Sequence, residues 1–393
     1  MNLPHGSLEG VKVLEMTQYY NGPYAGRMLG ELGADVIKIE PPWGDPQRHT
    51  PPFIGKDSLH FIFYNANKKF ITLNVKSEKG KEIFFKLVEQ SDIFIENFRP
   101  GTLDKLGIGY EKQKAVNPGI IYCSSSAYGE GPYKDLPGFD PVVQAFSGLM
   151  DTNGFPDMPT RLGTSGLDIV TPVFADLAIV SALRHRDRTG EGQSIDIAMY
   201  DVAVLMSQQS MVYYFGGYPV RTGPTSFMVS PEYLFRTRDG RVYVIIHTES
   251  AWTKLVDYFD RRDLLQDIRF KNNEKRVENR DDLIKIVSTW FAELTNRELI
   301  EIIEKVGGVC GEFRETPVQL DDPETTARKM YPEFVLPDRN KVRIPGSAFK
   351  LSITPGIVNS AGLPIGFHNE EIYFGMLGIG APEMFELKRS GVI

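Results

Sequence analysis

Asp168 is the residue of this chain whose surroundings most suggest chemistry. It lies in the segment 163–172, where small residues lead into a long apolar helix that we expect to run to about residue 188. An aspartate at a helix start is a common N-cap, and Pro172 suits a first helical turn. The same position favours an ionised carboxylate by ~0.3–1 kcal/mol, and an ionised aspartate can attack an activated acyl group. The spacing leaves both a structural cap and a nucleophile open.

Two polar clusters lie near the ends of predicted strands, where open α/β sheets bind their ligands. Lysine and arginine neutralise phosphates, and a phenylalanine offers its face to a base. Each cluster taken alone also fits a solvated rim or a turn. The candidate residues of the two clusters are Lys68 and Lys69, and Asn97, Phe98, Arg99 and Lys105.

A third candidate is the glycine series at 22, 26, 30 and 33, between two predicted strands. Its spacing differs from GxGxxG, and Pro23 follows the first glycine, which disfavours a nicotinamide site. Close packing of a helix on a sheet explains the glycines. Backbone N–H groups at that helix start can also hold a phosphate without the dinucleotide fingerprint.

The elements that must position these residues alternate between strand and helix patterns. Strands separated by helices imply parallel pairing and right-handed crossovers. The sequence therefore predicts an α/β fold with a doubly wound, Rossmann-like large domain. The expected strands are 11–16, 34–40, 70–75, 92–97, 120–126 and 194–199.

A second, smaller α+β domain is expected after Phe215. Glycines and prolines between 216 and 224 mark a linker-like turn region. Residues 230–247 predict a hairpin that turns at Asp239-Gly240, and residues 250–305 predict charged helices.

Composition excludes several function classes. A net charge of −7 argues against general binding to nucleic acid or to an anionic membrane. Cys123 and Cys310 lie far apart, and the six histidines form no HxxxH pair, so we predict no disulfide framework and no metal site. No apolar run reads as a membrane span, and a cytoplasmic location is expected.

Several long motifs, in order, resemble the class III coenzyme A transferases, also called the CaiB/BaiF family. This family includes formyl-CoA transferases and is related to the α-methylacyl-CoA racemases. The resemblance covers nearly the whole chain and is least specific over residues 215–340. The similar stretches include GVKVLEMTQYYNGPYAGRMLGELGADVIKIEPP, DIFIENFRPGTLDKLGIGYE, DPVVQAFSGLM, RTGEGQSIDIAMYD and LPIGFHNEEI.

The resemblance implies an architecture. The large CoA-binding domain would comprise residues 1–215 and return with residues 331–393, and the small domain would be inserted as residues 216–330. Two subunits of this family interlock as a homodimer.

The resemblance also implies a mechanism. Asp168 matches the family's catalytic aspartate and would pass CoA from an acyl-CoA donor, with succinyl-CoA as one candidate, to a carboxylic acid acceptor. The intermediates would be an aspartyl anhydride and an aspartyl-CoA thioester. Acyl-CoA is then a substrate, and no cofactor is bound permanently. Residues expected at the coenzyme site or close to it are Tyr20, Lys68, Lys69, Asn97, Phe98, Arg99, Lys105 and Asp140.

Two alternatives stay open. A racemase of the same family needs a histidine where this chain has Phe139, which cannot take a proton. Tyr20 stands where relatives that use oxalate carry a glutamine, which argues against an oxalate or formate role. A protein that binds CoA without catalysis is the second alternative, and the presence of Asp168 argues against it.

Overall fold

A six-stranded sheet forms the centre of the computed structural model, which describes residues 6–393. Its strands run in the order β10-β7-β6-β1-β2-β5, and every pairing is parallel. This confirms the predicted α/β class. The strands are β1 (Lys12–Met16), β2 (Asp35–Glu40), β5 (Lys68–Thr72), β6 (Ile93–Glu96), β7 (Ile121–Ser126) and β10 (Ser194–Ala198).

The strand order reverses between β1 and β6. The chain adds β2 and β5 on one side of β1, and then β6, β7 and β10 on the other. The connections that leave the carboxyl ends of β1 and β6 therefore diverge, and this switch point is where doubly wound sheets hold their ligands.

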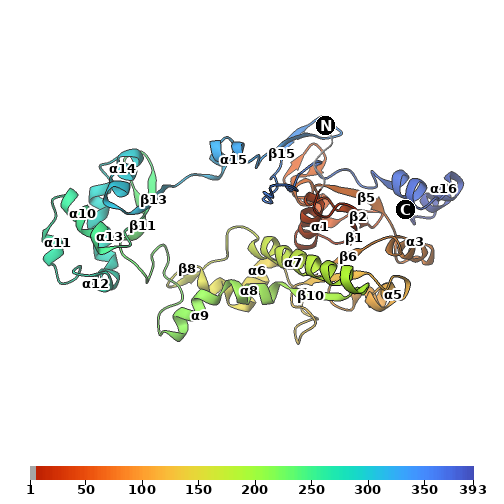
Figure 1. Ribbon diagram of the computed structural model, residues 1–393, viewed down its shortest axis with the longest axis horizontal. Helices are drawn as coiled ribbons and strands as arrows, with labels where there is room; N and C mark the ends of the chain where they lie inside the picture. The colour runs from red at the N-terminus through yellow and green to blue at the C-terminus, as the bar shows by residue number, and fades with distance from the viewer. Residues whose placement is uncertain (1–5) are drawn as a thin grey trace. The chain divides into compact units, whose positions relative to one another are not determined.

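Helices cover both faces of this sheet because side chains alternate along each strand. Val13 packs on one face with residues of α1 (Asn21–Glu31) and α7 (Gly166–Thr189). Leu14 packs on the other face with residues of α3 (Glu78–Val88) and α16 (Ala381–Arg389). Both faces are buried, as a parallel sheet requires, and Figure 1 shows the helices around the strands.

Close packing accounts for the glycines of α1. A Cβ at Gly22 would meet the side chain of Thr17, and one at Gly26 would meet the Glu15 carboxylate. The helix can approach β1 only without these Cβ atoms.

Helix α7 is long and apolar enough to cross a membrane, contrary to the expectation that no segment is. Just over half of its apolar window is buried inside the fold, where Ala175, Ile179 and Leu183 pack on the sheet. It is a core helix of an α/β sheet.

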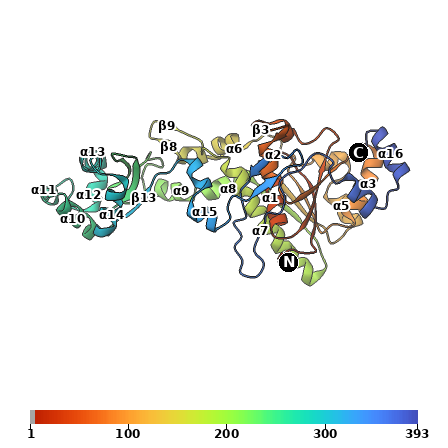
Figure 2. The same cartoon turned by 90° about the horizontal axis from the view of Figure 1, so that it is seen from above.

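The tail of the chain hydrogen-bonds to the edge strand β5. The backbone N–H of Phe70 donates to His368 Nδ1 at 2.9 Å, and that of Thr72 donates to Asn369 Oδ1 at 2.9 Å. Helix α16 then lies beside α3, as Figures 1 and 2 show from two directions. These contacts cover the only free edge that β5 would otherwise expose within the described residues.

The chain divides into two compact units. Unit 1 comprises residues 6–149, 162–208 and 323–393, and contains the parallel sheet. Unit 2 comprises residues 150–161 and 209–322. Its sheet has the order β11-β12-β13, and the pairing of Arg236 with Arg241 confirms the predicted hairpin.

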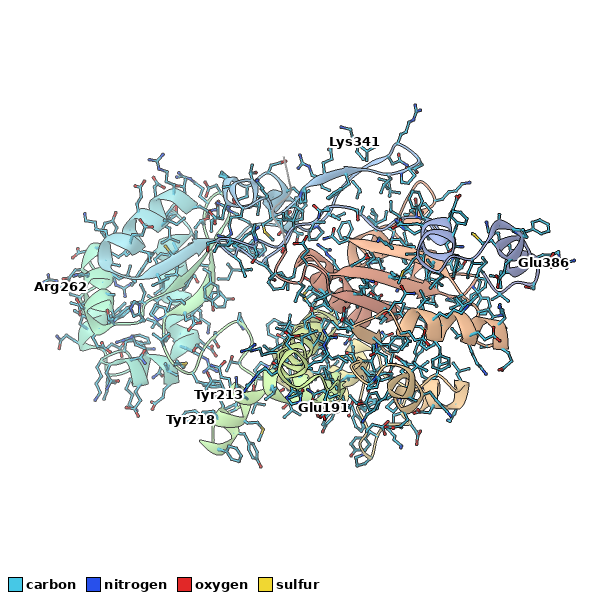
Figure 3. All side chains as sticks on the ribbon, turned by 45° about the vertical axis from the view of Figure 1, so that its right-hand side comes forward. Glu191, Tyr213, Tyr218, Arg262, Lys341 and Glu386 are labelled. Atoms are coloured by element: carbon cyan, nitrogen blue, oxygen red, sulfur yellow. The ribbon has the colours of Figure 1, made fainter. Side chains whose placement is uncertain are left out.

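Unit 2 has its own apolar core between this sheet and its helices, which includes Trp252, Phe270 and Phe291. Tyr213 and Tyr218 at the end of α9 both contact the Phe227 ring and lie close together in Figure 3. The elements are β11 (Glu232–Arg236), β12 (Arg241–Ile245), β13 (Val309–Glu312), α9 (Gln208–Phe215), α10 (Glu249–Tyr258), α11 (Asp263–Gln266), α12 (Asn273–Glu278), α13 (Arg280–Phe291) and α14 (Asn296–Val306).

Shorter elements complete the chain. The further helices are α2 (Leu59–Tyr64), α4 (Thr102–Leu106), α5 (Tyr110–Val116), α6 (Asp140–Ser147), α8 (Met199–Met206) and α15 (Pro323–Ala327). The two-stranded pairs are β3 (Phe53–Ile54) with β4 (Asp57–Ser58), β8 (Gly154–Phe155) with β9 (Met158–Pro159), and β14 (Glu333–Val335) with β15 (Lys341–Arg343). Single turns are η1 (Pro46–His49), η2 (Leu149–Thr152) and η3 (Thr316–Leu320), and η4 (Glu370–Met376) is a π-helix.

Candidate active site

Three neighbouring cavities open at the carboxyl ends of the parallel strands in unit 1. The Asp168 cavity and the Trp43 cavity each have a volume of about 250 Å³, and the Arg99 cavity has about 150 Å³. Gln18, Asn97 and Phe98 each line two of the three. The cavities therefore adjoin one another at the switch point between β1 and β6.

Asp140, and not Asp168, caps the start of α7. Asp168 is the third residue of that helix, and the N-cap residue Ser165 makes no side-chain cap bond. The Asp140 carboxylate reaches across from α6 and accepts from the backbone N–H of Leu167 at 2.6 Å and of Asp168 at 3.3 Å. The cap hypothesis for Asp168 is therefore wrong, because another carboxylate satisfies the free N–H groups of the first turn.

The Asp168 carboxyl group faces the cavity and is 9% exposed. Burial, followed by the nearby Asp140 carboxylate, raises the pKa of Asp168 from 3.8 to about 7. This shift corresponds to about 4 kcal/mol, whereas the helix start favours the anion by only ~0.3–1 kcal/mol. The expectation that Asp168 is simply ionised at neutral pH is wrong, since near pH 7 both of its forms are populated.

Tyr20 is the aromatic wall of this cavity. Its ring meets the Tyr64 ring edge-on at 4.7 Å and the His60 ring at 5.3 Å. Burial and the Asp168 carboxylate raise the pKa of Tyr20, and burial with Tyr20 and Asp168 raises the pKa of Tyr64 to about 12. Both phenols keep their protons at neutral pH, and Tyr20, which lines the cavity, can donate to an anion beside Asp168.

Asn97 holds the switch point together. It accepts from the backbone N–H of Gln18 and donates to its carbonyl, both at 2.8 Å, so the ends of β1 and β6 are joined by one side chain. Asn97 lines the Asp168 and Arg99 cavities, and Phe98 lines the Arg99 and Trp43 cavities. The structure thus brings Tyr20, Asn97 and Asp168 to one cavity.

Lys68 lies away from all three cavities. It is buried in β5, where its Nζ stands 2.7 Å from Glu15 Oε2 and donates to the Pro23 carbonyl at 2.7 Å. Glu15 also pairs with Lys38 at 3.1 Å. Because this network already matches the Lys68 charge inside the protein, we assign Lys68 no phosphate contact.

The other predicted cations differ in position. Lys69 pairs with Asp35 and Glu371 near the amino end of β5, the opposite edge of the sheet from the cavities. Arg99 is exposed and lines the Arg99 cavity together with Lys134. Lys105 is exposed on α4, whose Thr102 and other residues line the Trp43 cavity without it.

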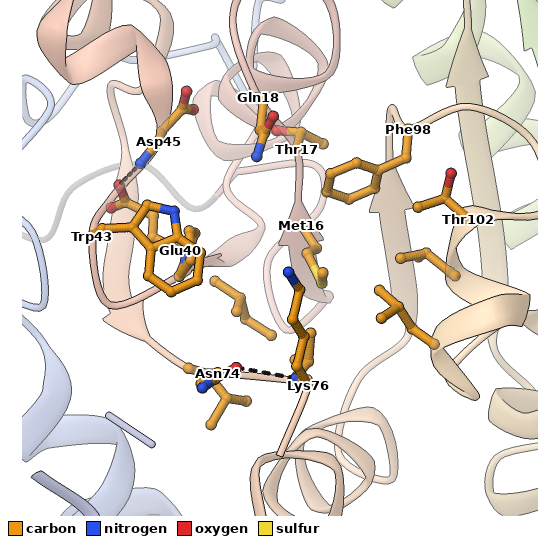
Figure 4. Close-up of a pocket in the computed structure, with 16 residues that line it drawn as sticks. Met16, Thr17, Gln18, Glu40, Trp43, Asp45, Asn74, Lys76, Phe98 and Thr102 are labelled. Carbon is orange, nitrogen blue, oxygen red and sulfur yellow. Dashed lines mark hydrogen bonds between the residues drawn. The ribbon is translucent and has the colours of Figure 1, made fainter. Parts of the chain in front are cut away.

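The Trp43 cavity contains two residues that the sequence patterns did not single out. Trp43 leaves 63% of its surface exposed, and Lys76 reaches into the cavity from the loop after β5. Figure 4 shows Trp43 and Phe98 on opposite sides with Lys76 between them. Trp43 and Phe98 line one cavity because the chain reverses the strand order between β1 and β6. Neither their spacing in the sequence nor the composition predicts this.

A parallel α/β sheet with a buried carboxylate at its ligand edge, beside three adjoining cavities, is an arrangement that suits an enzyme with a nucleotide-bearing substrate. The chain belongs to CoA-transferase family III, which its residues 8–369 match. It is thus a class III CoA-transferase, and the family resemblance is confirmed.

Known CoA-transferases are similar to this chain over nearly its whole length. The chain is 35% identical to a formyl-CoA:oxalate CoA-transferase of Streptomyces coelicolor, over 98% of this chain and 99% of the relative. It is 34% identical to a succinyl-CoA–D-citramalate CoA-transferase of Chloroflexus aurantiacus, over 99% of both. The crystal structure of a CaiB/BaiF family protein from Brucella suis is 32% identical and superposes with a TM-score of 0.85, over 94% of this chain and 99% of that one.

Proposed function

We propose that this enzyme moves CoA from an acyl-CoA donor to a carboxylic acid through covalent intermediates on Asp168. The observation that carries the proposal is the position of Asp168. It is buried in a cavity that it shares with Gln18 and Asn97 of the switch point. A buried carboxylate meets few waters, so an activated acyl group on it is protected from hydrolysis.

The steps conserve the thioester. A carboxylate oxygen of Asp168 attacks the acyl carbonyl, the C–S bond breaks, and the thiolate leaves with the electron pair. The thiolate then attacks the Asp168 carbonyl and the donor acid departs, which leaves an aspartyl-CoA thioester. The acceptor carboxylate attacks that thioester, and the released thiolate takes the acceptor acyl group from the new anhydride. Tyr20, which lines the Asp168 cavity, would stabilise the developing negative charge.

Coenzyme A would lie along the three cavities, with its base in the Trp43 cavity and its thioester in the Asp168 cavity. Two aromatic side chains there can stack on a base, and Lys76 can neutralise a phosphate. Arg99 and Lys134 at the intermediate cavity supply further positive charge for the phosphates. In domain terms, the large domain of residues 1–215 and 331–393 would bind the coenzyme.

Removing the Trp43 ring from its cavity should weaken acyl-CoA binding. Base–aromatic stacking contributes ~1–3 kcal/mol, so Trp43→Ala should raise the KM for acyl-CoA about 5- to 100-fold with kcat little changed. Lys76→Ala should act in the same direction. Lys81→Ala, which removes a half-buried lysine that pairs with Glu78 on α3 and lines none of the three cavities, is the control. Unchanged KM values in both cavity variants would place the base elsewhere.

The donor and acceptor are proposed from the chemistry of named relatives. We propose succinyl-CoA as donor and a small carboxylic acid as acceptor. A panel of succinyl-, acetyl- and formyl-CoA against D-citramalate, L-malate, mesaconate and oxalate, followed by mass spectrometry, tests this. The expected result is new acyl-CoA in at least one pair with succinyl-CoA and none with Asp168→Asn. Hydrolysis alone, or deuterium uptake at C2 of a 2-methylacyl-CoA without an acceptor, would overturn the assignment.

We also propose that the enzyme acts as an interlocked homodimer. The outer face of α7 leaves Val173, Leu177 and Val180 exposed at 50%, 64% and 40%, although the helix is otherwise a core element. Apolar surface of this kind marks an association site, and homo-oligomers pair like surfaces. Light scattering should report twice the chain mass.

A single charged substitution tests whether the exposed apolar face of α7 forms the dimer interface. Leu177→Glu should shift the particle toward the single-chain mass, because a carboxylate would be buried without a partner. Ile353→Glu alters a residue that is 83% exposed in the tail and should leave the mass unchanged. A single-chain mass for the unaltered protein would contradict the dimer.

A further inference from the structure

Gln144 uses both ends of its side-chain amide inside the protein. It is fully buried on α6, its Nε2 donates to Asp140 Oδ1 at 2.5 Å, and its Oε1 accepts from the backbone N–H of Leu162 at 2.9 Å. The other Asp140 oxygen holds the N–H groups of Leu167 and Asp168. One side chain therefore fastens both the loop before α7 and the carboxylate that caps α7.

These partners fix the direction of every hydrogen bond. Leu162 can only donate through its N–H, so the Gln144 oxygen must face it and the Gln144 nitrogen must face Asp140. Asp140 then accepts three hydrogen bonds and donates none, which is the pattern of an ionised carboxylate. Apolar packing of Val143 against Leu167 holds α6 and α7 in this register.

An ionised Asp140 has a direct effect on its neighbour. The titratable groups that face Asp168 are Asp140 from α6 and the phenols of Tyr20 and Tyr64. Two adjacent carboxyl groups in different surroundings separate into a charged and a protonated member. Here the hydrogen bonds assign the charge to Asp140 and leave the exchangeable proton to Asp168.

We infer that Gln144 is a positioning residue for CoA transfer, which fixes Asp140 as the ionised cap and so sets the place and protonation state of Asp168. The inference rests on the proposed function of Asp168. Gln144 does not line the Asp168 cavity. It acts through its hydrogen bonds to Asp140 and to the Leu162 backbone.

Gln144→Met removes both hydrogen bonds and keeps the side-chain length. We expect kcat to fall about 10²-fold, since small displacements of a reacting group cost that much, while the KM for acyl-CoA stays within about threefold. The acid limb of the pH–rate profile should also shift, because Asp140 and the Leu162 backbone no longer hold the start of α7 in the same place around Asp168. Gln144→Glu can replace the amide only while protonated, so its rate relative to the unaltered enzyme should decline as pH rises.

Gln113→Met is the matched control. Gln113 is also fully buried on a short helix of unit 1, where its Nε2 donates to the Ile108 carbonyl at 2.8 Å. This variant removes a buried glutamine amide away from the three cavities and should leave kcat and the pH–rate profile unchanged. Equal kinetic losses in the two methionine variants, or an unaltered rate and profile in Gln144→Met, would overturn the role of Gln144.

A second measurement needs no turnover. In protein labelled with ¹³C at the aspartate carboxyl carbon, the Asp168 signal is identified by its loss in Asp168→Asn. It should titrate near pH 7 in the unaltered chain and at a different pH in Gln144→Met. An identical titration in both proteins would overturn the inference, whereas the absence of transfer in the unaltered enzyme would overturn the proposed function alone.

Discussion

Replacing Asp168 by asparagine is expected to lower CoA transfer by about 10⁴-fold or more, because the amide cannot form the anhydride or the thioester. The Trp43 cavity is separate from this carboxyl group, so acyl-CoA should still bind with a Kd within about threefold of the unaltered enzyme. Steady-state kinetics and calorimetric titration with an acyl-CoA measure the two effects separately.

Asp176→Asn is the matched control for this variant. Asp176 lies two turns further along α7 and is also buried, and burial, followed by Glu31, raises its pKa well above the ordinary aspartate value. It lines none of the three cavities. Transfer should therefore persist in Asp176→Asn, and an equal loss in both variants would show that any carboxyl group in the helix matters for folding rather than for chemistry.

The same Asp168→Asn variant should be more stable than the unaltered enzyme at alkaline pH. The folded-state pKa of Asp168 is raised to about 7 by burial and Asp140, above 3.8 in the unfolded chain. The stability that the protonated carboxyl contributes is therefore fully present below about pH 4 and is lost as pH rises through 7. Asparagine cannot ionise, so the difference in unfolding free energy should grow across this window to at most about 4 kcal/mol.

Urea unfolding between pH 5 and pH 8.5 measures this difference. The gain should be about 1–2 kcal/mol at pH 5 and should reach its plateau above pH 7. Asp187→Asn changes an exposed aspartate on the same helix and should track the unaltered enzyme throughout. A stability difference that is independent of pH would mean that folded Asp168 is ionised over the whole range. The rate of acyl-enzyme formation should rise through the same pH region, since only the carboxylate attacks.

The sequence patterns predicted the parallel sheet well because the central strands β1 and β6 are mostly apolar and buried on both faces. Strand 11–16 alternates between two buried clusters, and helix patterns separate it from the next strands. The start of β5 was placed two residues late. The sequence places Lys68 before the predicted strand, but the residue is the first of β5. Its buried ammonium group pairs there with the Glu15 carboxylate of β1. A lysine–glutamate pair between residues so far apart in sequence leaves no local signal.

Part of the candidate site could be predicted from the sequence. Asp168 stood out through its small-residue approach, and the family resemblance added Asn97, Phe98 and Asp140. The capping role of Asp140 could not be derived from spacing, because its partner N–H groups lie 27 and 28 positions away. Trp43 follows two prolines in an unpatterned loop, and only the fold brings it opposite Phe98.

The central claim is a covalent intermediate on one particular carboxyl group, and peptide mass spectrometry can locate it. The enzyme is incubated in turn with succinyl-, acetyl- and formyl-CoA, treated with borohydride and cleaved with trypsin. Cleavage after Arg161 and Arg184 releases a single peptide that contains both Asp168 and Asp176. Reduction of an aspartyl thioester converts that aspartate to homoserine. We predict homoserine at position 168 and unchanged aspartate at position 176 with at least one donor. Unmodified aspartate at 168 with all three donors, in enzyme that still transfers CoA, would contradict the account.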